Sequence, residues 1–183
     1  GKVLCMGTTF VADPETDNLE FAYAAAGADS TSYNDTAPTT AVFSVGTDAM
    51  VNQSTKAIEA YCFAEVQGFS KMGYYSGNGN VRGTKVYCGF KPKYVLIKSI
   101  GGGDDWASKI SGLTGFGLGG QRTRNVRYNS DTCQTTANIQ FESNGFRCAT
   151  TSTYCNQEDT KYVYMAFAEM PMVGSNGTIA LGT

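Results

Sequence analysis

The residue types that most often carry catalysis are sparse in this sequence. Its 183 residues include no histidine, which removes the usual Ser-His and Cys-His nucleophile arrangements and most transition-metal sites. Glycoside hydrolysis would instead need two carboxylates that face each other across a cleft. Two adjacent pairs are candidates, Asp104 with Asp105 and Glu158 with Asp159. Adjacency in the sequence does not make two carboxylates face each other, so we expect no catalytic residues.

Three acids near the start of the chain resemble the first part of a calcium-binding loop. Asp13, Glu15 and Asp17 alternate as in an EF-hand. The sixth position of such a loop requires glycine and the twelfth requires glutamate, but Asn18 and Ala24 stand there. The pattern therefore fails as an EF-hand, and we expect no cofactor. A non-specific Ca²⁺ site at the three acids stays open as an alternative.

Aromatic residues beside polar ones are candidates for stacking on sugar rings. Trp106 is the only tryptophan, and it directly follows Asp104 and Asp105. A contact with a glycan or another receptor is one interpretation of this group, to which three tyrosines could contribute: Tyr74, Tyr75 and Tyr128. The alternative, which we favour for the tryptophan, is a core residue under a loop.

Glu65 and Glu169 each end a run of apolar residues. A functional interpretation makes them acids whose pKa is raised by burial. The structural interpretation is favoured, because an unpaired buried charge is costly. It predicts that each carboxylate accepts backbone N–H groups or pairs with a basic side chain, with Lys98 and Lys2 as candidate partners.

The strongest pattern is an internal repeat. Residues 52–66 (NQSTKAIEAYCFAEV) align without a gap with residues 156–170 (NQEDTKYVYMAFAEM) at an offset of 104, and Phe63 matches Phe167. We predict that the Asn-Gln pair at the start of each copy forms a polar turn, and that the run of β-type residues after it is a buried strand that closes one copy of a repeated unit. Further segments match in the same order: 2–4 with 93–97, 33–41 with 128–137, and 42–43 with 139–141.

The composition favours strands over helices. Only 16% of the residues are charged, whereas 11 tyrosines and 10 phenylalanines are present, and no long helical stripe occurs. We therefore predict an all-β fold with two tandem homologous, antiparallel, sandwich-like units and a connecting hairpin. The expected divisions are a first unit at 1–66, a hairpin at 67–92 with strands 70–76 and 84–88, a second unit at 93–170 and an extension at 171–183. Because the first unit lacks such a lead-in hairpin, we expect the natural polypeptide to continue upstream.

Charge and cysteine content exclude several classes. A net charge of −2 provides no basic stripe for nucleic acid, and no apolar run approaches the roughly 20 residues of a membrane span. The six cysteines lack C-x-x-C pairs, so a zinc site is disfavoured. Three disulfides are one arrangement. We favour mostly free thiols, with Cys133, Cys148 and Cys155 the first to oxidise because their neighbours in the sequence are polar.

Several long strings resemble a domain of tail-fibre and other virion proteins of marine bacteriophages. They cover most of the chain: 33–38, 42–47, 61–71, 77–79, 86–92, 143–146 and 162–169. The resemblance implies a virion component, assembled in the host cytoplasm and displayed on the particle, that forms the C-terminal end of a longer chain and associates as a homotrimer with other virion proteins. It implies no catalytic residue, and residues 112–127 depart from it most.

From this resemblance we expect a structural part of a tail fibre that adheres to the host surface, with a cell-surface glycan as the receptor. The alternative is a capsid decoration or other architectural virion protein without receptor activity. A polysaccharide-degrading enzyme is the least favoured of the three functions.

Overall fold

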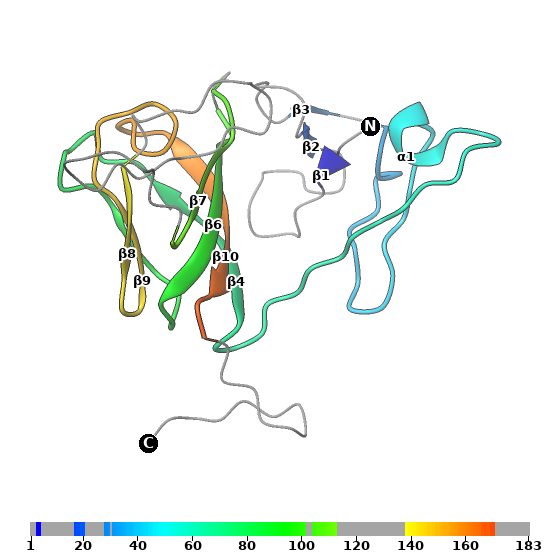
Figure 1. Ribbon diagram of the computed structural model, residues 1–183. Coiled ribbons are helices and arrows are strands. Elements are labelled where there is room, and N and C mark those ends of the chain that lie inside the picture. Colours follow the sequence, from blue (N-terminus) through cyan, green and yellow to red (C-terminus); the bar gives the residue numbers. More distant parts are fainter. Residues whose placement is uncertain are drawn as a thin grey trace.

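The regular structure of this chain is almost entirely β (Figure 1), which confirms the predicted fold class. The computed structural model describes residues 3–4, 17–20, 28–29, 31–101, 104–112 and 138–170. Two antiparallel sheets form a sandwich, with strand orders β4-β10-β6-β7 and β5-β9-β8. Their strands are β4 (Ser70–Ser76), β5 (Lys85–Tyr87), β6 (Pro92–Ser99), β7 (Ala107–Ile110), β8 (Ile139–Glu142), β9 (Gly145–Cys148) and β10 (Lys161–Ala168).

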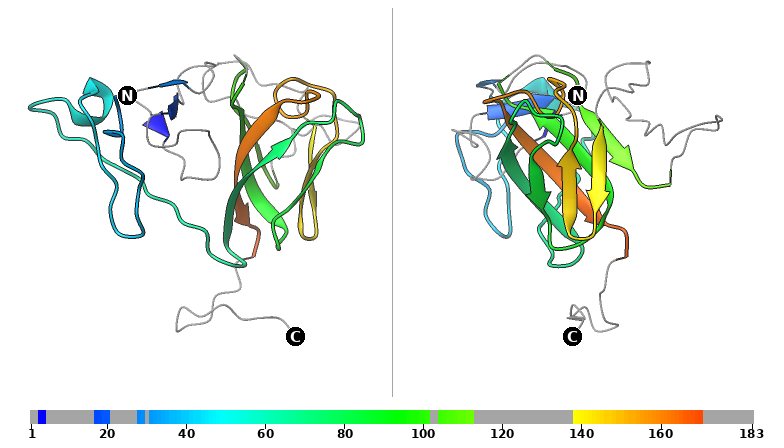
Figure 2. Two further views of the ribbon diagram at one scale, coloured as in Figure 1. Left: turned by 180° about the vertical axis from the view of Figure 1, so that it is seen from behind. Right: turned by 90° about the vertical axis from the view of Figure 1, so that its left-hand side faces the viewer.

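The main core lies between these two sheets. Successive side chains of a strand point to opposite faces, and in β10 the residues Tyr162, Tyr164 and Ala166 enter this core. They meet Phe146 from β9 and Ile139 from β8, both fully buried. The side view in Figure 2 shows the two sheets stacked face to face.

The opposite face of the four-stranded sheet is covered as well. A small sheet of β1 (Val3–Leu4), β2 (Asp17–Glu20) and β3 (Ala28–Asp29) supplies Leu19, which packs against Leu96, Trp106 and Val163. Burial on both faces explains why β6 and β10 read as nearly continuous apolar runs instead of alternating ones.

The predicted connecting hairpin is a β-arch. Its two strands occur where the sequence placed them, but β4 pairs with β10 whereas β5 pairs with β9. The turn after β4 therefore carries the chain from one sheet to the other, and the prediction that the two strands pair with each other was wrong. We call residues 68–90 the β4–β5 arch.

Two corners of the chain repeat the same backbone hydrogen bonds at the offset of 104. We call residues 46–56 the first corner and residues 150–160 the second corner. The amide of Asn52 donates to the carbonyl of Asp48 at 2.8 Å, and that of Asn156 donates to Ser152 at 2.8 Å. Asp48 is also the N-cap of the short helix α1 (Ala49–Asn52). The repeat is thus visible in the local structure of these corners.

Other features of the corners agree. The side-chain amide of Asn52 donates to the carbonyl six residues earlier at 2.8 Å, and the amide of Asn156 does so at 2.7 Å. Thr55 and Asp159 both have positive φ, at 66° and 57°. In each corner the following amide closes the turn over 3.3 Å: Lys56 to Gln53, and Thr160 to Gln157.

Beyond the corners the two copies diverge. Residues 161–168 form the central strand β10, but residues 57–65 form no strand and are exposed. The prediction of a buried strand after the Asn52-Gln53 turn was therefore wrong, and the strand expected at 42–45 is also absent from the structure. Figures 1 and 2 show the chain between α1 and β4 running apart from the sandwich. We call residues 57–65 the first run. The prediction of two similar sandwich units extends beyond the described residues and stays a prediction.

Candidate functional site

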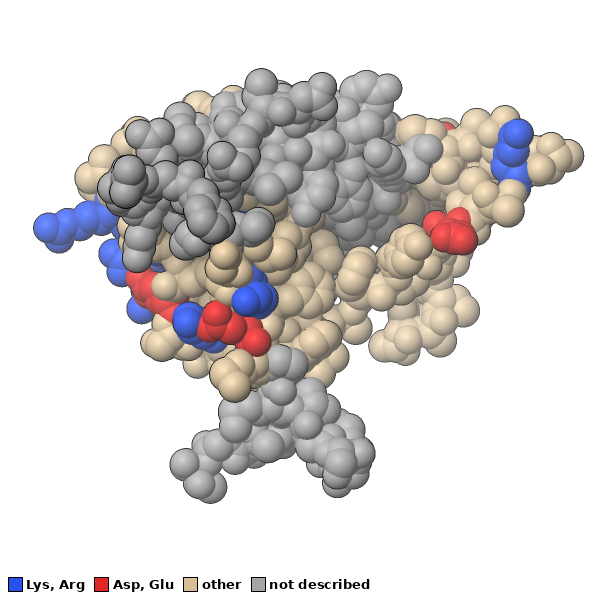
Figure 3. Space-filling model, viewed as in Figure 1, with Lys and Arg blue, Asp and Glu red and all other residues tan. Residues whose placement is uncertain are grey.

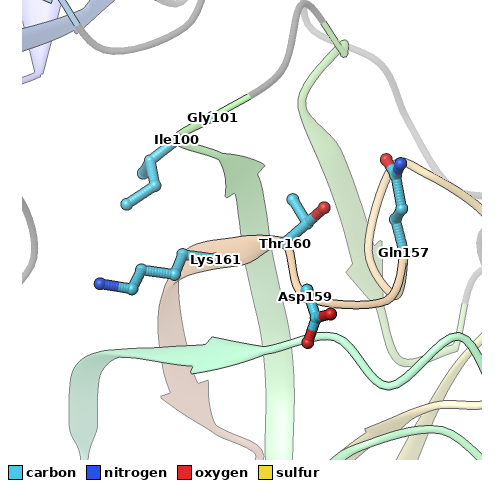
Figure 4. Close-up of a pocket in the computed structure, with 6 residues that line it drawn as sticks. All are labelled: Ile100, Gly101, Gln157, Asp159, Thr160 and Lys161. Atoms are coloured by element: carbon cyan, nitrogen blue, oxygen red, sulfur yellow. The ribbon is translucent and has the colours of Figure 1, made fainter.

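A polar hollow lies at the loop end of the sandwich, where β6 ends and β10 begins. Its volume is about 610 Å³, and six residues line it: Ile100, Gly101, Gln157, Asp159, Thr160 and Lys161 (Figure 4). The side chains of Ile100 and Lys161 extend to the same side, whereas Gln157 lies on the other side of Thr160. The hollow thus combines an apolar side chain with an ammonium, a carboxylate, an amide and a hydroxyl.

The backbone around the hollow is held in place by the second corner. The amide of Ile100 donates to the carbonyl of Lys161 at 3.1 Å. The amide of Gln157 donates to the hydroxyl of Tyr162 at 3.0 Å, and this hydroxyl in turn donates to the carbonyl of Thr153 at 2.5 Å. Because Tyr162 is itself fully buried, the loop that carries Gln157 and Asp159 is fixed to the core.

The polar side chains of the hollow are available to a ligand. Within the described part of the chain, Gln157, Asp159 and Lys161 make no side-chain hydrogen bond or ion pair. All three are exposed. Together they offer hydrogen-bond donors and acceptors and one charge of each sign.

Two of the aromatic residues predicted to contact a glycan are core residues. Trp106 is buried on the outer face of the four-stranded sheet, which confirms the favoured interpretation and excludes stacking on a sugar. Tyr75 lies between the sheets, where its hydroxyl donates to the carbonyl of Cys155 at 2.8 Å. Its ring stacks on that of Tyr162, with the centroids 5.2 Å apart. Burial raises the pKa of the Tyr75 hydroxyl.

The other predicted contact residues do not form one group. Tyr74 is exposed on β4, and Tyr128 lies outside the described residues. Asp104 and Asp105 are half-buried, and Asp104 accepts a hydrogen bond from the Thr153 hydroxyl at 2.8 Å. This bond places Asp104 at the same end of the sandwich as the hollow.

Glu65 and Glu169 both have structural partners. Glu65 accepts the Met72 amide and the Lys71 ammonium, each at 3.1 Å. Glu169 pairs with Lys91 at 2.5 Å and accepts the Ser111 hydroxyl at 2.9 Å. The bonds from Lys91 and then from Ser111 lower the pKa of the Glu169 carboxyl, which is opposite to the shift that a poised acid would need.

The prediction that Lys98 pairs with Glu65 or Glu169 was wrong. Lys98 is fully buried and donates to the carbonyl of Ser99 at 2.9 Å. Burial lowers the pKa of its ammonium to about 8, against the opposing effects of Asp104 and Asp105. Lys2, the other candidate, lies outside the described residues.

No group of three or more potential metal ligands occurs among the residues that the structure describes. The acids of the failed EF-hand pattern lie largely outside these residues, since Asp13 and Glu15 are not described. Of Asp17 only the backbone is described, at the start of β2.

The charges of the sandwich are interleaved. Lys85 and Arg147 both pair with Glu142 at 2.8 Å, and these bonds, that of Lys85 first, lower the pKa of the carboxyl. In the view of Figure 3, basic and acidic side chains lie beside one another on the sandwich. This view therefore shows no single-sign field of the kind that phosphate backbones require.

The described cysteines are free thiols: Cys62, Cys88, Cys148 and Cys155. Cys148 and Cys155 are fully buried, so the expectation of polar surroundings was wrong for these two, because their polar sequence neighbours do not surround them in space. That they oxidise first stays a prediction. Cys62, in the first run, is exposed. Cys5 and Cys133 lie outside the described residues.

The sequence pointed to the hollow only in part. Glu158 and Asp159 stood out as a carboxylate pair, and Gln157 belongs to the repeated Asn-Gln. Ile100 and Gly101 gave no signal, because they approach the second corner only through the pairing of β6 with β10. Non-local pairing of this kind is invisible in a local pattern.

Fold and site together define an all-β sandwich protein with a polar hollow at one end. Among the described residues, no helix has the length and apolar content to cross a membrane. The chain belongs to the family described as Domain of unknown function (DUF7483), whose profile matches residues 6–171. Neither the curated proteins nor the solved structures include a match.

Proposed function

We propose that this protein is a structural, adhesive part of a bacteriophage tail fibre, and that it contacts a host-surface glycan through the hollow. The observation that carries the proposal is the set of polar groups of Gln157, Asp159 and Lys161 around the apolar Ile100, whose side chains have no polar partner among the residues described. Sugars present hydroxyls that donate and accept hydrogen bonds beside apolar C–H faces, and the hollow offers partners for both. The virion assignment rests on the resemblance of the sequence strings.

The rigid support of the hollow favours the binding of a ligand. Ligand-binding groups that are already ordered lose little conformational entropy when the ligand arrives. Here the loop is tied to the core through Tyr162 and Asn156, which are both fully buried. A shallow hollow binds weakly by itself, so we propose that a homotrimer of the fibre multiplies the affinity.

A glycan array, probed with the protein displayed on a multivalent support, tests this function. The double variant Asp159→Asn and Lys161→Met removes both charges, and asparagine tolerates the positive φ of Asp159. We expect the wild type to bind one glycan class and the variant to lose at least about tenfold in apparent affinity. Lys56→Met, in the turn of the first corner, is the matched control and retains binding.

Two outcomes contradict the adhesive role. The first is that the displayed wild type binds no glycan, and the second is that the double variant binds as well as the wild type. Turnover of host polysaccharide that is lost in Asp104→Asn or Asp105→Asn would replace adhesion by hydrolysis.

A second candidate function is an architectural virion protein without a receptor, such as a capsid decoration. The exposed apolar side chains of the first run favour this function, because an exposed apolar surface suits a protein partner. Electron microscopy of particles labelled with an antibody to this chain separates the two, because a fibre tip and a capsid surface lie at different places.

A further inference from the structure

The first run is unusually apolar for a segment with so few contacts. Ile58 is 49% exposed, Tyr61 79% and Phe63 58%. Its only aromatic contact in the described chain is an edge-on approach of Phe63 to Phe167, with ring centroids 5.8 Å apart. In the part of the chain that the structure describes, no backbone amide or carbonyl of residues 57–63 is hydrogen-bonded.

The matched residues in the second copy show what this sequence pattern packs against. At the offset of 104, Ile58 corresponds to Tyr162 and Phe63 to Phe167. Those residues belong to β10, which pairs with β4 along one edge and with β6 along the other. The same pattern is thus a central strand in one copy, whereas in the other it pairs with no strand that the structure describes.

The corners show which partner differs. The side-chain amide of Asn156 donates to the Asn78 side chain at 3.0 Å and to the Asn80 carbonyl at 2.9 Å, and its oxygen accepts the Asn78 amide at 3.1 Å. These partners all belong to the turn of the β4–β5 arch. The side chain of Asn52, in the same conformation, bonds only to the carbonyl of Gly46 among the described residues. In the part of the chain that the structure describes, the first corner therefore has no arch bound to its asparagine.

Glycine makes the arch fit closely. A Cβ atom added at Gly77 would lie 2.1 Å from the carbonyl oxygen of Gln157, which no relaxation of a backbone group accommodates cheaply. The arch turn can approach an Asn-Gln corner only if this position is glycine. In the first corner, Gln53 stands at the position that corresponds to Gln157.

Charge favours the same partner. Glu65 already pairs with Lys71 of this chain, which leaves two acids, Asp48 and Glu59, against Lys56 on residues 46–66. The arch sequence carries three basic residues and no acid: Lys71, Arg82 and Lys85. Opposite net charges of this kind steer association and fix its orientation.

We propose that residues 46–66 are a docking surface for a β-arch of the same type as residues 68–90, carried by a partner polypeptide. One strand of that arch pairs with the first run by β-augmentation, and its Gly-Asn-Gly-Asn turn bonds to Asn52. A second copy of this chain is not the occupant, because its own arch is already bound to Asn156 and β10. This surface lies in the first copy, so the proposal does not depend on glycan binding.

A synthetic peptide of residues 68–90, under reducing conditions, is the probe. Hydrogen exchange of the intact protein, followed by mass spectrometry, reports where the peptide binds. We expect the peptide to slow the exchange of amides 57–64 by at least about tenfold, because they gain a strand partner. Asn52→Ala in the protein weakens this protection, and it is safe for folding because Asn52 is exposed.

The matched control is the same peptide with Gly77→Val, which keeps the strands and charges but collides with the corner. Equal protection by both peptides overturns the proposed geometry, and no protection by either overturns the docking surface. Protection confined to β10 and β4 would mean that the peptide replaces the protein's own arch, which also contradicts the proposal. If sedimentation shows concentration-dependent association that protects 57–64 without peptide, a second copy covers the run and the proposal is wrong.

Discussion

The first and second corners share their hydrogen bonds, yet one leads into an exposed chain and the other into the centre of a sheet. The turns at Asn52 and Asn156 are each held by hydrogen bonds to residues within about six positions in the sequence. The strand that follows is decided by neighbours far away in the sequence, because β10 exists through its pairing with β4 and β6. Local sequence therefore determines the corners, whereas the strand after a corner forms only where the surrounding sheet provides partner strands.

Truncating matched residues of the two runs should show the largest difference in stability between the two copies. Tyr162→Ala removes a fully buried ring, and we expect it to lower the free energy of unfolding by about 4 kcal/mol. Ile58→Ala, at the matched exposed position, should cost less than about 1 kcal/mol. Urea denaturation measures both. If the two substitutions lower the free energy of unfolding by the same amount, the first run is buried in solution.

The two asparagines give the next largest difference. Asn156→Ala deletes a buried amide whose two N–H groups are shared among three acceptors. It leaves the carbonyls of Thr150 and Asn80 without this donor, which should cost about 2–3 kcal/mol. Asn52→Ala deletes one bond of the side chain and should cost about 0.5–1 kcal/mol.

Asn156→Asp sharpens this test, because aspartate has nearly the same shape but cannot donate. It should destabilise the protein at least as much as alanine does, since it directs a carboxylate at two carbonyls. A mild effect of Asn156→Asp would show that packing, not donated hydrogen bonds, holds the second corner together.

The same contrast explains which parts of the structure the sequence predicted. The Asn-Gln turns were predicted correctly, because Asp48 and Ser152 accept the bonds that shape them within four residues. The strand expected after Asn52-Gln53 was predicted wrongly from composition and periodicity. These show that a run of residues suits a strand, but not whether a partner strand is present. The arch was misread as a hairpin for the same reason.

The candidate site was predictable to a similar extent. Trp106 was correctly favoured as a core residue. The hollow was not found, because Ile100 and Lys161 are brought together by the register of β6 against β10. The tyrosine pair at 74 and 75 shows the limit clearly: neighbours in a strand point to opposite faces, so one is exposed and the other is buried.

A smaller effect comes from the buried thiol of the arch. Burial raises the pKa of Cys88 to about 12, partly offset by Lys71. The unfolded thiol ionises near its ordinary pKa of about 9, so the folded state binds more protons than the unfolded state between these values. The stability contribution is therefore full below about pH 9 and is lost as the pH rises towards about 12.

Urea denaturation across this alkaline range measures the loss. Cys88→Ala should lose stability less steeply above about pH 9 than the wild type does. Cys62→Ala, at the exposed position in the first run, is the matched control for the slope. A Cys88→Ala profile parallel to that of the wild type would show that other groups, such as the buried tyrosines, account for the alkaline loss.

The last and mildest test leaves stability untouched and compares the thiols directly. Cys62 is exposed, whereas Cys88, Cys148 and Cys155 are buried, so iodoacetamide at neutral pH should label Cys62 first among the four, as judged by peptide mass spectrometry. In denaturant all four should react at similar rates, because the difference lies in access. The arch peptide with Cys88→Ser should slow the labelling of Cys62, since the proposed strand covers that residue. Labelling of Cys148 as fast as Cys62 in the native protein would contradict the buried sandwich core, and so would remove the contrast between the two copies.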